Sequence, residues 1–129
     1  MIGDEGTKDD PLTREIIGAA IEVHKALGPG LLESAYERCL AREVAIRGLR
    51  VERQIEVALE YKGERIDCAY RMDLVVEGSV LVEIKAVERL LPIHDAQVLT
   101  YLRLTGLRKA LLLNFNTAYL RGGIKRLVQ

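Results

Sequence analysis

Two acidic residues and one lysine, Asp73, Glu83 and Lys85, stand where neighbouring strands could bring their side chains together. Glu83 and Lys85 alternate with apolar residues in the segment VEIKA, so they share one face of a strand, about 6.6 Å apart along it. If the chain reverses through a three-residue loop at 77–79, Asp73 lies directly opposite Glu83. A two-residue loop would separate them. The shared face is therefore either solvated or a site.

The chemistry of this trio follows from the repulsion between its two carboxylates. Directly opposed residues have Cβ atoms about 5 Å apart, and two carboxylates at that distance repel by about 3 kcal/mol at an effective dielectric of about 20. A shared proton, Lys85 or a divalent cation such as Mg²⁺ could offset this repulsion. Two carboxylates beside an ammonium are what metal-assisted attack on a phosphodiester requires. The alternative is a surface ion pair between Glu83 and Lys85, worth under about 1 kcal/mol.

Two helices are expected before the strands. Residues 1–11 are polar and acidic and are predicted to be a flexible tail, with a single domain over 12–129. Thr13 can cap a helix with apolar residues at helical spacing, which stops at the sequence GPG at 28–30. A second helix should run from about Leu32 to Arg47, with Gly48 closing it. Its predicted inner face consists of Ala35, Tyr36, Cys39, Leu40 and Val44.

The next two segments alternate with a period of two and predict antiparallel strands over 55–61 and 66–76. A two-residue type II′ turn at Gly63 and Glu64 would pair Leu59 with Cys68, Val57 with Tyr70 and Ile55 with Met72. A third strand is expected over about 80–87. One face of this meander would then pack on the helices through Met72, Leu74, Val76, Val80, Val82 and Ile84.

A third helix is expected from Pro92 to about Thr105, ended by Gly106. His94, Gln97 and Tyr101 fall on one stripe of it. Buried strands over 109–115 and 124–128 complete the chain. The order of elements predicts a mixed α/β sandwich without internal repeats.

Composition excludes several classes of protein. The chain has 129 residues, 49% of them hydrophobic, and no stretch approaches the roughly 18 uncharged apolar residues that span a bilayer. The acidic start lacks the features of a signal peptide, so we expect a cytoplasmic protein that does not engage a membrane. Cys39 and Cys68 form neither a zinc motif nor a disulfide framework and are expected to be buried thiols.

Formal net charge is zero, but its distribution is uneven. No acidic residue occurs from Ala96 to Gln129, and that stretch contains Arg103, Arg108, Lys109, Arg121, Lys125 and Arg126. These side chains could meet phosphates or form a solvated surface. The charge pattern alone favours the solvated surface.

The order of these residues resembles a known family. Asp73, the run Glu83-Ile84-Lys85 and the later pair Gln97 and Tyr101 are similar to the PD-(D/E)XK nuclease superfamily, with the QxxxY motif of its exonuclease-like branch. The run from Gly30 to Tyr36, GLLESAY, also resembles the motif of the GxxExxY proteins, small bacterial and archaeal members of that superfamily. The similarity extends from about Leu12 to the C-terminus. Met72 departs from it, because the superfamily name expects proline before the aspartate.

The resemblance implies a restriction-endonuclease-like core, an α/β fold with a mixed sheet, an antiparallel meander and flanking helices. It implies that Asp73, Glu83 and the backbone carbonyl of Ile84 hold Mg²⁺, for which Mn²⁺ could substitute, with Glu33 reaching the metal and Lys85 helping to activate water. Gln97 and Tyr101 would border the site and bind substrate. The expected function is a Mg²⁺-dependent nuclease acting on DNA. The alternative is an inactive module of the same fold that binds nucleic acid or a protein partner. So short a domain has little surface for substrate selection, which is compatible with a homodimer or with a partner that supplies specificity.

Structural explanations also exist for several of these residues. Glu33 could merely favour a helix N-terminus, a stabilisation of about 0.3 to 1 kcal/mol. Gln97 and Tyr101 could form a polar rim. Tyr36 is expected in the core with its hydroxyl at the boundary, and His24 is expected to be a core histidine with a hydrogen-bond partner. His94 shares a stripe with Gln97 and receives no catalytic role.

Overall fold

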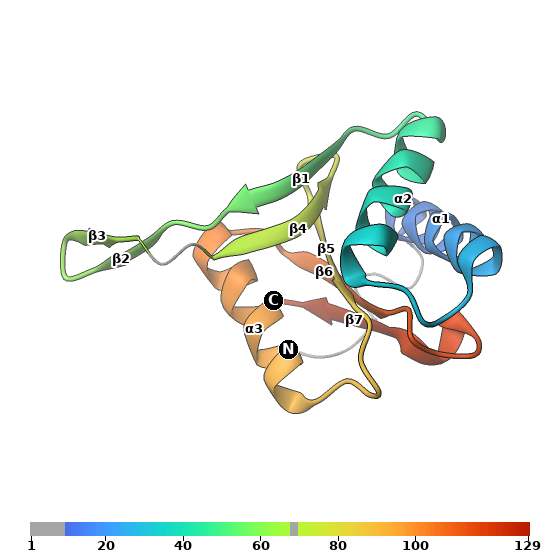
Figure 1. Ribbon diagram of the computed structural model, residues 1–129. Coiled ribbons are helices and arrows are strands. Elements are labelled where there is room, and N and C mark those ends of the chain that lie inside the picture. Colours follow the sequence, from blue (N-terminus) through green and yellow to red (C-terminus); the bar gives the residue numbers. More distant parts are fainter. Residues whose placement is uncertain (1–9, 68–69) are drawn as a thin grey trace.

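The computed structural model describes residues 10–67 and 70–129, and within them a mixed five-stranded sheet lies between helices (Figure 1). The sheet has the order β1-β4-β5-β6-β7, in which β5 and β6 are parallel and the other neighbours are antiparallel. A separate hairpin, β2-β3, extends from it. The elements are α1 (Pro11–Leu27), α2 (Glu33–Ile46), β1 (Val51–Glu56), β2 (Leu59–Tyr61), β3 (Glu64–Ile66), β4 (Arg71–Val76), β5 (Val80–Lys85), α3 (Pro92–Thr105), β6 (Lys109–Asn114), the 3-10 helix η1 (Leu120–Gly123) and β7 (Ile124–Val128).

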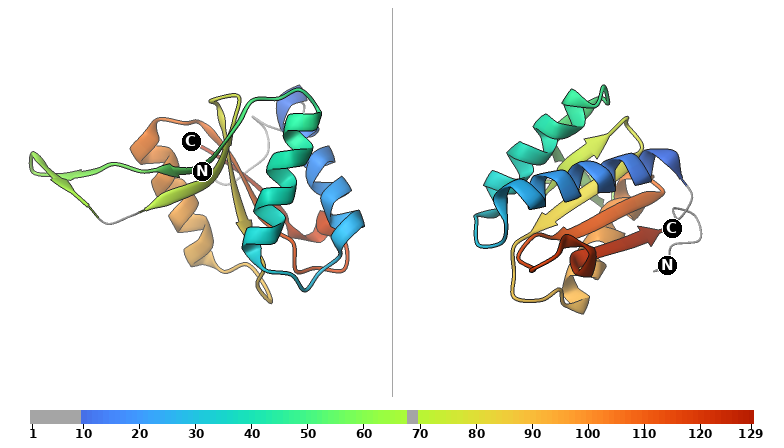
Figure 2. Two further views of the ribbon diagram at one scale, coloured as in Figure 1. Left: turned by 45° about the horizontal axis from the view of Figure 1, so that its top comes forward. Right: turned by 90° about the vertical axis from the view of Figure 1, so that its right-hand side faces the viewer.

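Both faces of the sheet are covered, as expected when a parallel pair needs a helical crossover. Helices α1 and α2 lie over one face and α3 over the other (Figures 1 and 2). The first core contains Leu74 and Val82 with side chains of α1 and α2, and the second contains Val75 and Leu81 with side chains of α3. The predicted apolar face was wrong in one member, because Met72 packs in the second core. The α/β fold class is confirmed.

Helix α1 begins earlier than predicted. Its N-cap is Asp10, whose carboxylate accepts hydrogen bonds from Leu12 N at 3.0 Å and from Thr13 Oγ1 at 3.1 Å. Pro11 follows at the first helical position, where its missing N–H costs nothing. Thr13 is thus a buried residue of the first turn and not the cap. The last residues of the predicted tail belong to the helix start, while residues 1–9 lie outside the described part of the chain.

The other two helices follow the sequence closely. Helix α3 has the predicted bounds, and Gly106 ends it in the left-handed region with φ 80°. Helix α2 lies within one residue of its predicted bounds at each end. Its inner face differs in one respect, because Cys39 is exposed and not the buried thiol that was expected. Cys68 lies outside the described residues.

The first hairpin is partly as predicted. Ile55 pairs with Met72, and Val57 N donates to Tyr70 O at 2.9 Å, which confirms the predicted register at the base. Beyond it, β2 and β3 pair Leu59 with Ile66, so the predicted partner Cys68 was wrong. The turn residues are Lys62 and Gly63, with φ of 50° and 84°, which corresponds to a type I′ turn instead of type II′. The β2-β3 hairpin projects from the body of the domain (Figures 1 and 2).

The C-terminal hairpin supports the strand that carries Glu83 and Lys85. Strand β6 runs beside β5, and the Asn114 side chain both accepts from Val87 N at 3.1 Å and donates to Val87 O at 3.0 Å. Gly123, in η1, packs directly on the Asn114 backbone. Asn114 therefore fixes the chain just beyond β5, and Gly123 leaves it the room to do so.

We predict that Gly123→Ala destabilises the fold, because the added Cβ would overlap the carbonyl oxygen of Asn114, which is backbone and cannot swing away. The free energy of unfolding, measured by urea denaturation, should fall by about 1–3 kcal/mol. Gly122→Ala is the matched control, since a Cβ there meets no atom within 4 Å. Equal stabilities of the two variants would contradict the close packing at Asn114.

Candidate active site

The reversal between β4 and β5 brings Asp73 and Glu83 together. The loop residues are 77–79, as predicted, and the strands pair Val76 with Val80 and Leu74 with Val82. The next pair along this register is Asp73 with Glu83. The three-residue loop, on which the predicted juxtaposition depended, is therefore confirmed.

Asp73 and Glu83 join their strands through side chains. Asp73 N donates a hydrogen bond to Glu83 Oε1 at 2.8 Å, and Ile84 N donates one to Asp73 Oδ2 at 2.8 Å. Each carboxylate thus accepts from the backbone of the opposite strand. Glu83 is only 4% exposed, and its second oxygen, Oε2, accepts no hydrogen bond from the described residues. We refer to Asp73 and Glu83 as the carboxylate pair.

Burial disfavours the state in which both members of the carboxylate pair are ionised. The pKa of Glu83 is raised from 4.5 to about 8, chiefly by burial and next by the neighbouring charge of Asp73, while the hydrogen bond from Asp73 N and the charge of Lys85 oppose the rise. Burial likewise raises the pKa of Asp73, against the hydrogen bond from Ile84 N. A buried acidic pair of this kind favours either a retained proton or a bound cation.

Lys85 lies on the same strand face as Glu83, as the alternation predicted. Its side chain is half-buried, and its charge lowers the pKa of both members of the carboxylate pair. Among the described residues, no acidic oxygen lies within 4 Å of its ammonium nitrogen to form an ion pair. The Lys85 charge is therefore close to the pair without being tied to one partner.

Glu33 reaches the same end of the sheet from the first turn of α2. Its Oε2 accepts a hydrogen bond from Ala86 N at 3.1 Å, just beyond Lys85, and its charge raises the pKa of Asp73. The side chain is exposed. Glu33 thus approaches the carboxylate pair from α2 and is bonded to Ala86, the first residue after β5.

The loop before α2 is held by Tyr36. Its hydroxyl donates to Gly28 O at 2.5 Å and accepts from Leu31 N at 3.1 Å, and its ring stacks on Phe115 with centroids 4.6 Å apart. Gly30 takes φ 100° in this loop, a conformation that a Cβ would strain. These residues fix the entry into α2 and hence the position of Glu33. The predicted burial of Tyr36 is confirmed.

Glu37 is a site residue that the sequence analysis missed. It is 6% exposed and accepts from Gln54 Nε2 at 2.6 Å and from Arg53 Nε at 3.1 Å. Gln54 Nε2 also lies 3.5 Å from Asp73 Oδ1, and Gln54 has φ 53° in the middle of β1. A glutamate one turn after Glu33 on α2 was the available signal. Gln54 therefore connects α2 to the carboxylate pair.

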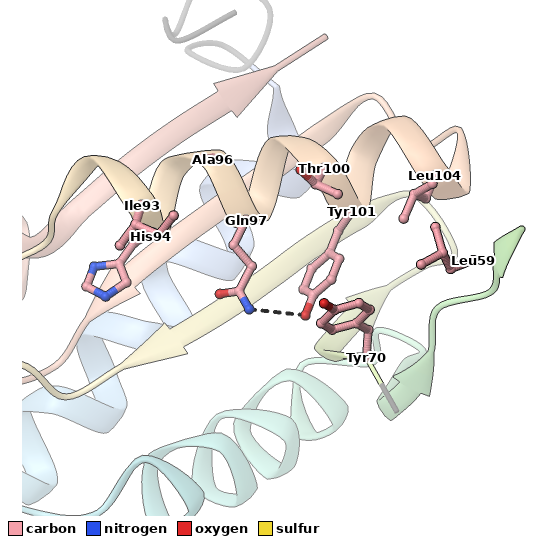
Figure 3. A pocket seen from close by; sticks show the side chains of 9 residues that line it. All are labelled: Leu59, Tyr70, Ile93, His94, Ala96, Gln97, Thr100, Tyr101 and Leu104. Carbon is pink, nitrogen blue, oxygen red and sulfur yellow. Dashed lines mark hydrogen bonds between the residues drawn. The ribbon is translucent and has the colours of Figure 1, made fainter. Parts of the chain in front are cut away.

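Gln97 and Tyr101 lie on one stripe of α3, and Tyr101 packs with Leu81 on the sheet face that also carries Glu83. Gln97 Nε2 donates to Tyr101 Oη at 3.2 Å (Figure 3). Burial raises the pKa of Tyr101, and the charge of Glu83 raises it further, which places this hydroxyl near the pair. His94 lies on the same stripe, and its Nδ1 accepts from Leu91 N at 2.9 Å at the helix start. His24 is a core histidine, with Nε2 2.8 Å from Thr117 O.

The basic residues of the C-terminal stretch are distributed over several elements, and two of them form ion pairs. Lys109 forms an ion pair with Asp10 at 2.5 Å, and Lys125 forms one with Asp95 at 2.9 Å. The exposed members of the stretch, Arg103, Arg108 and Arg121, lie on α3, the loop after it and η1. This arrangement agrees with the solvated surface that the charge pattern favoured.

The carboxylate pair has the donors that a hard divalent cation requires. Asp73 Oδ1 and Glu83 Oε2 are not used by the strand N–H groups, and Mg²⁺ is commonly bound through one or two carboxylates while it keeps several waters. Within residues 10–67 and 70–129, no three His, Cys, Asp or Glu side chains converge as metal ligands. The residues present therefore fit a two-carboxylate ion.

Comparison with protein families agrees with this geometry. Residues 10–127 match the model of the PD-(D/E)XK nuclease superfamily. The chain belongs to the PD-(D/E)XK nuclease superfamily. The matched range contains every site residue described above, so this superfamily member has its acidic pair and lysine within the shared domain. No curated protein and no solved structure shows significant similarity to it. Among its described helices, none has the length and apolar character needed to cross a membrane.

We predict that the native state loses stability as the pH rises. An unfolded Glu83 ionises near its ordinary pKa of 4.5, whereas the folded residue keeps its proton to about 8. Between these values the folded state binds more protons, so the free energy of unfolding should decrease across the window, at about 1.4 kcal/mol for each pH unit that separates the two pKa values.

Urea denaturation between about pH 5 and about pH 8 would measure this loss. Glu83→Gln should flatten the curve, since the amide oxygen can still accept from Asp73 N but the group does not ionise. Glu60→Gln, on the exposed hairpin, is the matched control and should leave the pH dependence as it is. Stability that rises over this pH range would contradict the raised pKa of the pair.

Proposed function

We propose that this superfamily member is a Mg²⁺-dependent nuclease that hydrolyses phosphodiester bonds in DNA, and that it belongs to the GxxExxY branch. The observation that carries the proposal is the reciprocal hydrogen bonding of Asp73 and Glu83, which orients a half-buried and a buried carboxylate beside Lys85, whose ammonium forms no ion pair with the described residues. Each carboxylate keeps one oxygen that no strand N–H occupies. The family match and the motif from Gly30 to Tyr36 support it.

Each site residue would have a separate role in binding the metal, activating water or contacting the substrate. Asp73 Oδ1, Glu83 Oε2 and the backbone carbonyl of Ile84 would hold the ion, and Glu33, which does not converge with the pair among the described residues, would approach the ion from α2. When bound, Mg²⁺ would place positive charge next to a phosphate oxygen and would lower the pKa of a water molecule, which makes that water a better nucleophile. Lys85 would orient the attacking water and stabilise negative charge that develops on the phosphate. Gln97 and Tyr101 would contact the substrate from α3.

We predict that the purified protein cuts DNA in the presence of Mg²⁺ or Mn²⁺, and that Asp73→Asn, Glu83→Gln and Lys85→Met each lower the rate by about 100-fold or more. Labelled single-stranded and double-stranded DNA, with RNA as a third substrate, would be followed by gel electrophoresis. Glu60→Gln and Lys62→Met, on the projecting hairpin, are the charge-matched controls and should cut at the parental rate. Parental protein that leaves every substrate intact would exclude the nuclease proposal.

A second candidate is an inactive module of this fold that binds nucleic acid or a protein partner. It is favoured by one observation, that the carboxylate pair is already satisfied in part by strand N–H groups and has no third converging carboxylate among the described residues. In that case the pair would be a structural link between β4 and β5.

Calorimetric titration with Mn²⁺ separates the two candidates. For a nuclease we expect parental protein to bind the ion and Asp73→Ala to bind it at least about tenfold more weakly, since one of two carboxylate ligands is lost. Glu60→Ala, on the exposed β2-β3 hairpin, is the control for charge alone. An ion affinity that does not change in Asp73→Ala would favour the inactive module.

A further inference from the structure

A pocket of about 470 Å³ opens between α3 on one side and the side chains of Leu59 and Tyr70 on the other (Figure 3). Its walls are largely apolar and include Leu59, Leu104 and Ile93, of which Ile93 is 67% exposed. A volume of about 300–1,000 Å³ is typical of sites for small organic groups. The pocket therefore has the size and lining for one planar ring system.

Two tyrosines give the pocket an aromatic wall. The rings of Tyr70 and Tyr101 have centroids 6.4 Å apart and are tilted by 59°, so they do not stack on each other. Tyr70 is 46% exposed, whereas Tyr101 is 4% exposed. The Tyr70 ring therefore keeps surface free for a flat partner, and Tyr101 stands beside it at an angle (Figure 3).

The pocket adjoins the carboxylate pair through Tyr101. This residue lines the pocket and packs in the second core with Val75 and Leu81, which share their strand faces with Asp73 and Glu83, and the raised pKa of its hydroxyl, due to burial and then to the charge of Glu83, agrees with this position. Gln97, bonded to the same hydroxyl, also lines the pocket. A group held in the pocket would thus lie next to whatever the carboxylate pair acts on.

The polar groups of the pocket suit an uncharged ligand. Among the described residues, no lysine or arginine lines it, so a phosphate there would meet no cation while lying near Glu83. His94, Gln97 and Thr100 lie along the α3 side. Because His94 Nδ1 accepts from Leu91 N, the neutral ring has Nε2 as a donor. These groups can hydrogen-bond the edge of a nucleobase.

We propose that this pocket holds one unstacked nucleobase of the substrate strand, stacked on Tyr70, beside the phosphodiester at the carboxylate pair. The inference rests on the proposed nuclease function and names its substrate more closely. A base within a duplex is stacked between its neighbours and cannot enter such a pocket. The preferred substrate is therefore a strand with unpaired bases at the cut, a single strand or a frayed end.

Binding without cleavage tests the pocket directly. A single strand that contains 2-aminopurine is titrated with protein in EDTA, and both the fluorescence of the base analogue and the anisotropy of a terminal label are followed. We expect the fluorescence to fall as the analogue stacks on Tyr70. Tyr70→Ala should abolish this change and weaken binding about tenfold, equivalent to about 1.4 kcal/mol.

Two further variants separate stacking from a general loss of structure. Tyr70→Phe keeps the ring and should bind within about twofold of the parental protein. Tyr119→Ala removes a tyrosine that is 82% exposed and lies away from the pocket, beside η1, and it should behave as the parental protein does. Circular dichroism of each variant checks the fold.

The same strands also test the position of the base. With Mg²⁺ present, a single abasic residue is moved along the strand, and cleavage should fall only when it lies next to the cut. Unchanged 2-aminopurine fluorescence at saturating protein, equal behaviour of Tyr70→Ala and parental protein, or equal binding of duplex and single strand would each overturn the proposal. So would self-association of the protein that Tyr70→Ala abolishes without an effect on strand binding, because the pocket would then be an interface between copies.

Different results would exclude the nuclease activity and the nucleobase pocket. Fluorescence quenching that depends on Tyr70, in a protein that cuts nothing, would leave the base pocket and remove the nuclease. Cleavage that is indifferent to Tyr70 and to every abasic position would leave the nuclease and remove the pocket.

Discussion

The exchange of hydrogen bonds between Asp73 and Glu83 is the interaction on which the site depends. Just beyond the last paired residues of β4 and β5, Leu74 and Val82, each carboxylate accepts from the backbone of the opposite strand, so the side chains cannot rotate freely. A charge-assisted bond to a backbone N–H offsets part of the cost of taking a carboxylate out of water, but not all of it, as the raised pKa of Glu83 shows. The carboxylates of Asp73 and Glu83 thereby link the two strands. A bound cation would stabilise their charges, whereas each charge destabilises the other.

The charged residues around the pair do not fully compensate the cost of burying its two carboxylates. Glu37 is paired with Arg53 and bonded by Gln54, and Glu33 is bonded by Ala86 N, so the acidic residues of α2 have partners of their own. Lys85 is the cation that the pair shares, one positive charge for two carboxylates. When both carboxylates are ionised, one negative charge thus remains uncompensated. A proton supplies the missing positive charge at low pH, and a divalent ion could supply it at higher pH. Gln54 reaches this arrangement from a left-handed backbone conformation, which costs roughly 1–2 kcal/mol for a residue with a Cβ.

Much of this architecture was predictable because it depends on local patterns. The alternation in β4 and β5 and the loop at 77–79 determine which residues face each other, and Pro92 and Gly106 determine the bounds of α3. The hairpin was less predictable, since a two-residue turn can begin at Lys62 or at Gly63 with similar apolar pairing, and the type I′ turn requires positive φ at both. Glu37 was missed because a charged residue next to Tyr36 on an apolar face is read as solvated. The burial of Glu37 depends on Arg53 and Gln54, which come from strand β1 and cannot be recognised as its partners in the sequence.

The two flanks of the site differ in charge, and this difference gives the substrate a direction of approach. On the α2 side, Glu33 forms no ion pair with the described residues and adds negative charge close to Asp73, and Glu37, although paired with Arg53, also raises the pKa of Asp73. On the α3 side, no acidic residue follows Asp95, and Asp95 itself is paired with Lys125. A polyanionic strand is repelled by the first flank and not by the second, so its backbone should cross the carboxylate pair from the side of α3. That is also the side on which Tyr70 and Tyr101 offer aromatic surface, so repulsion from α2 and stacking near α3 favour the same path.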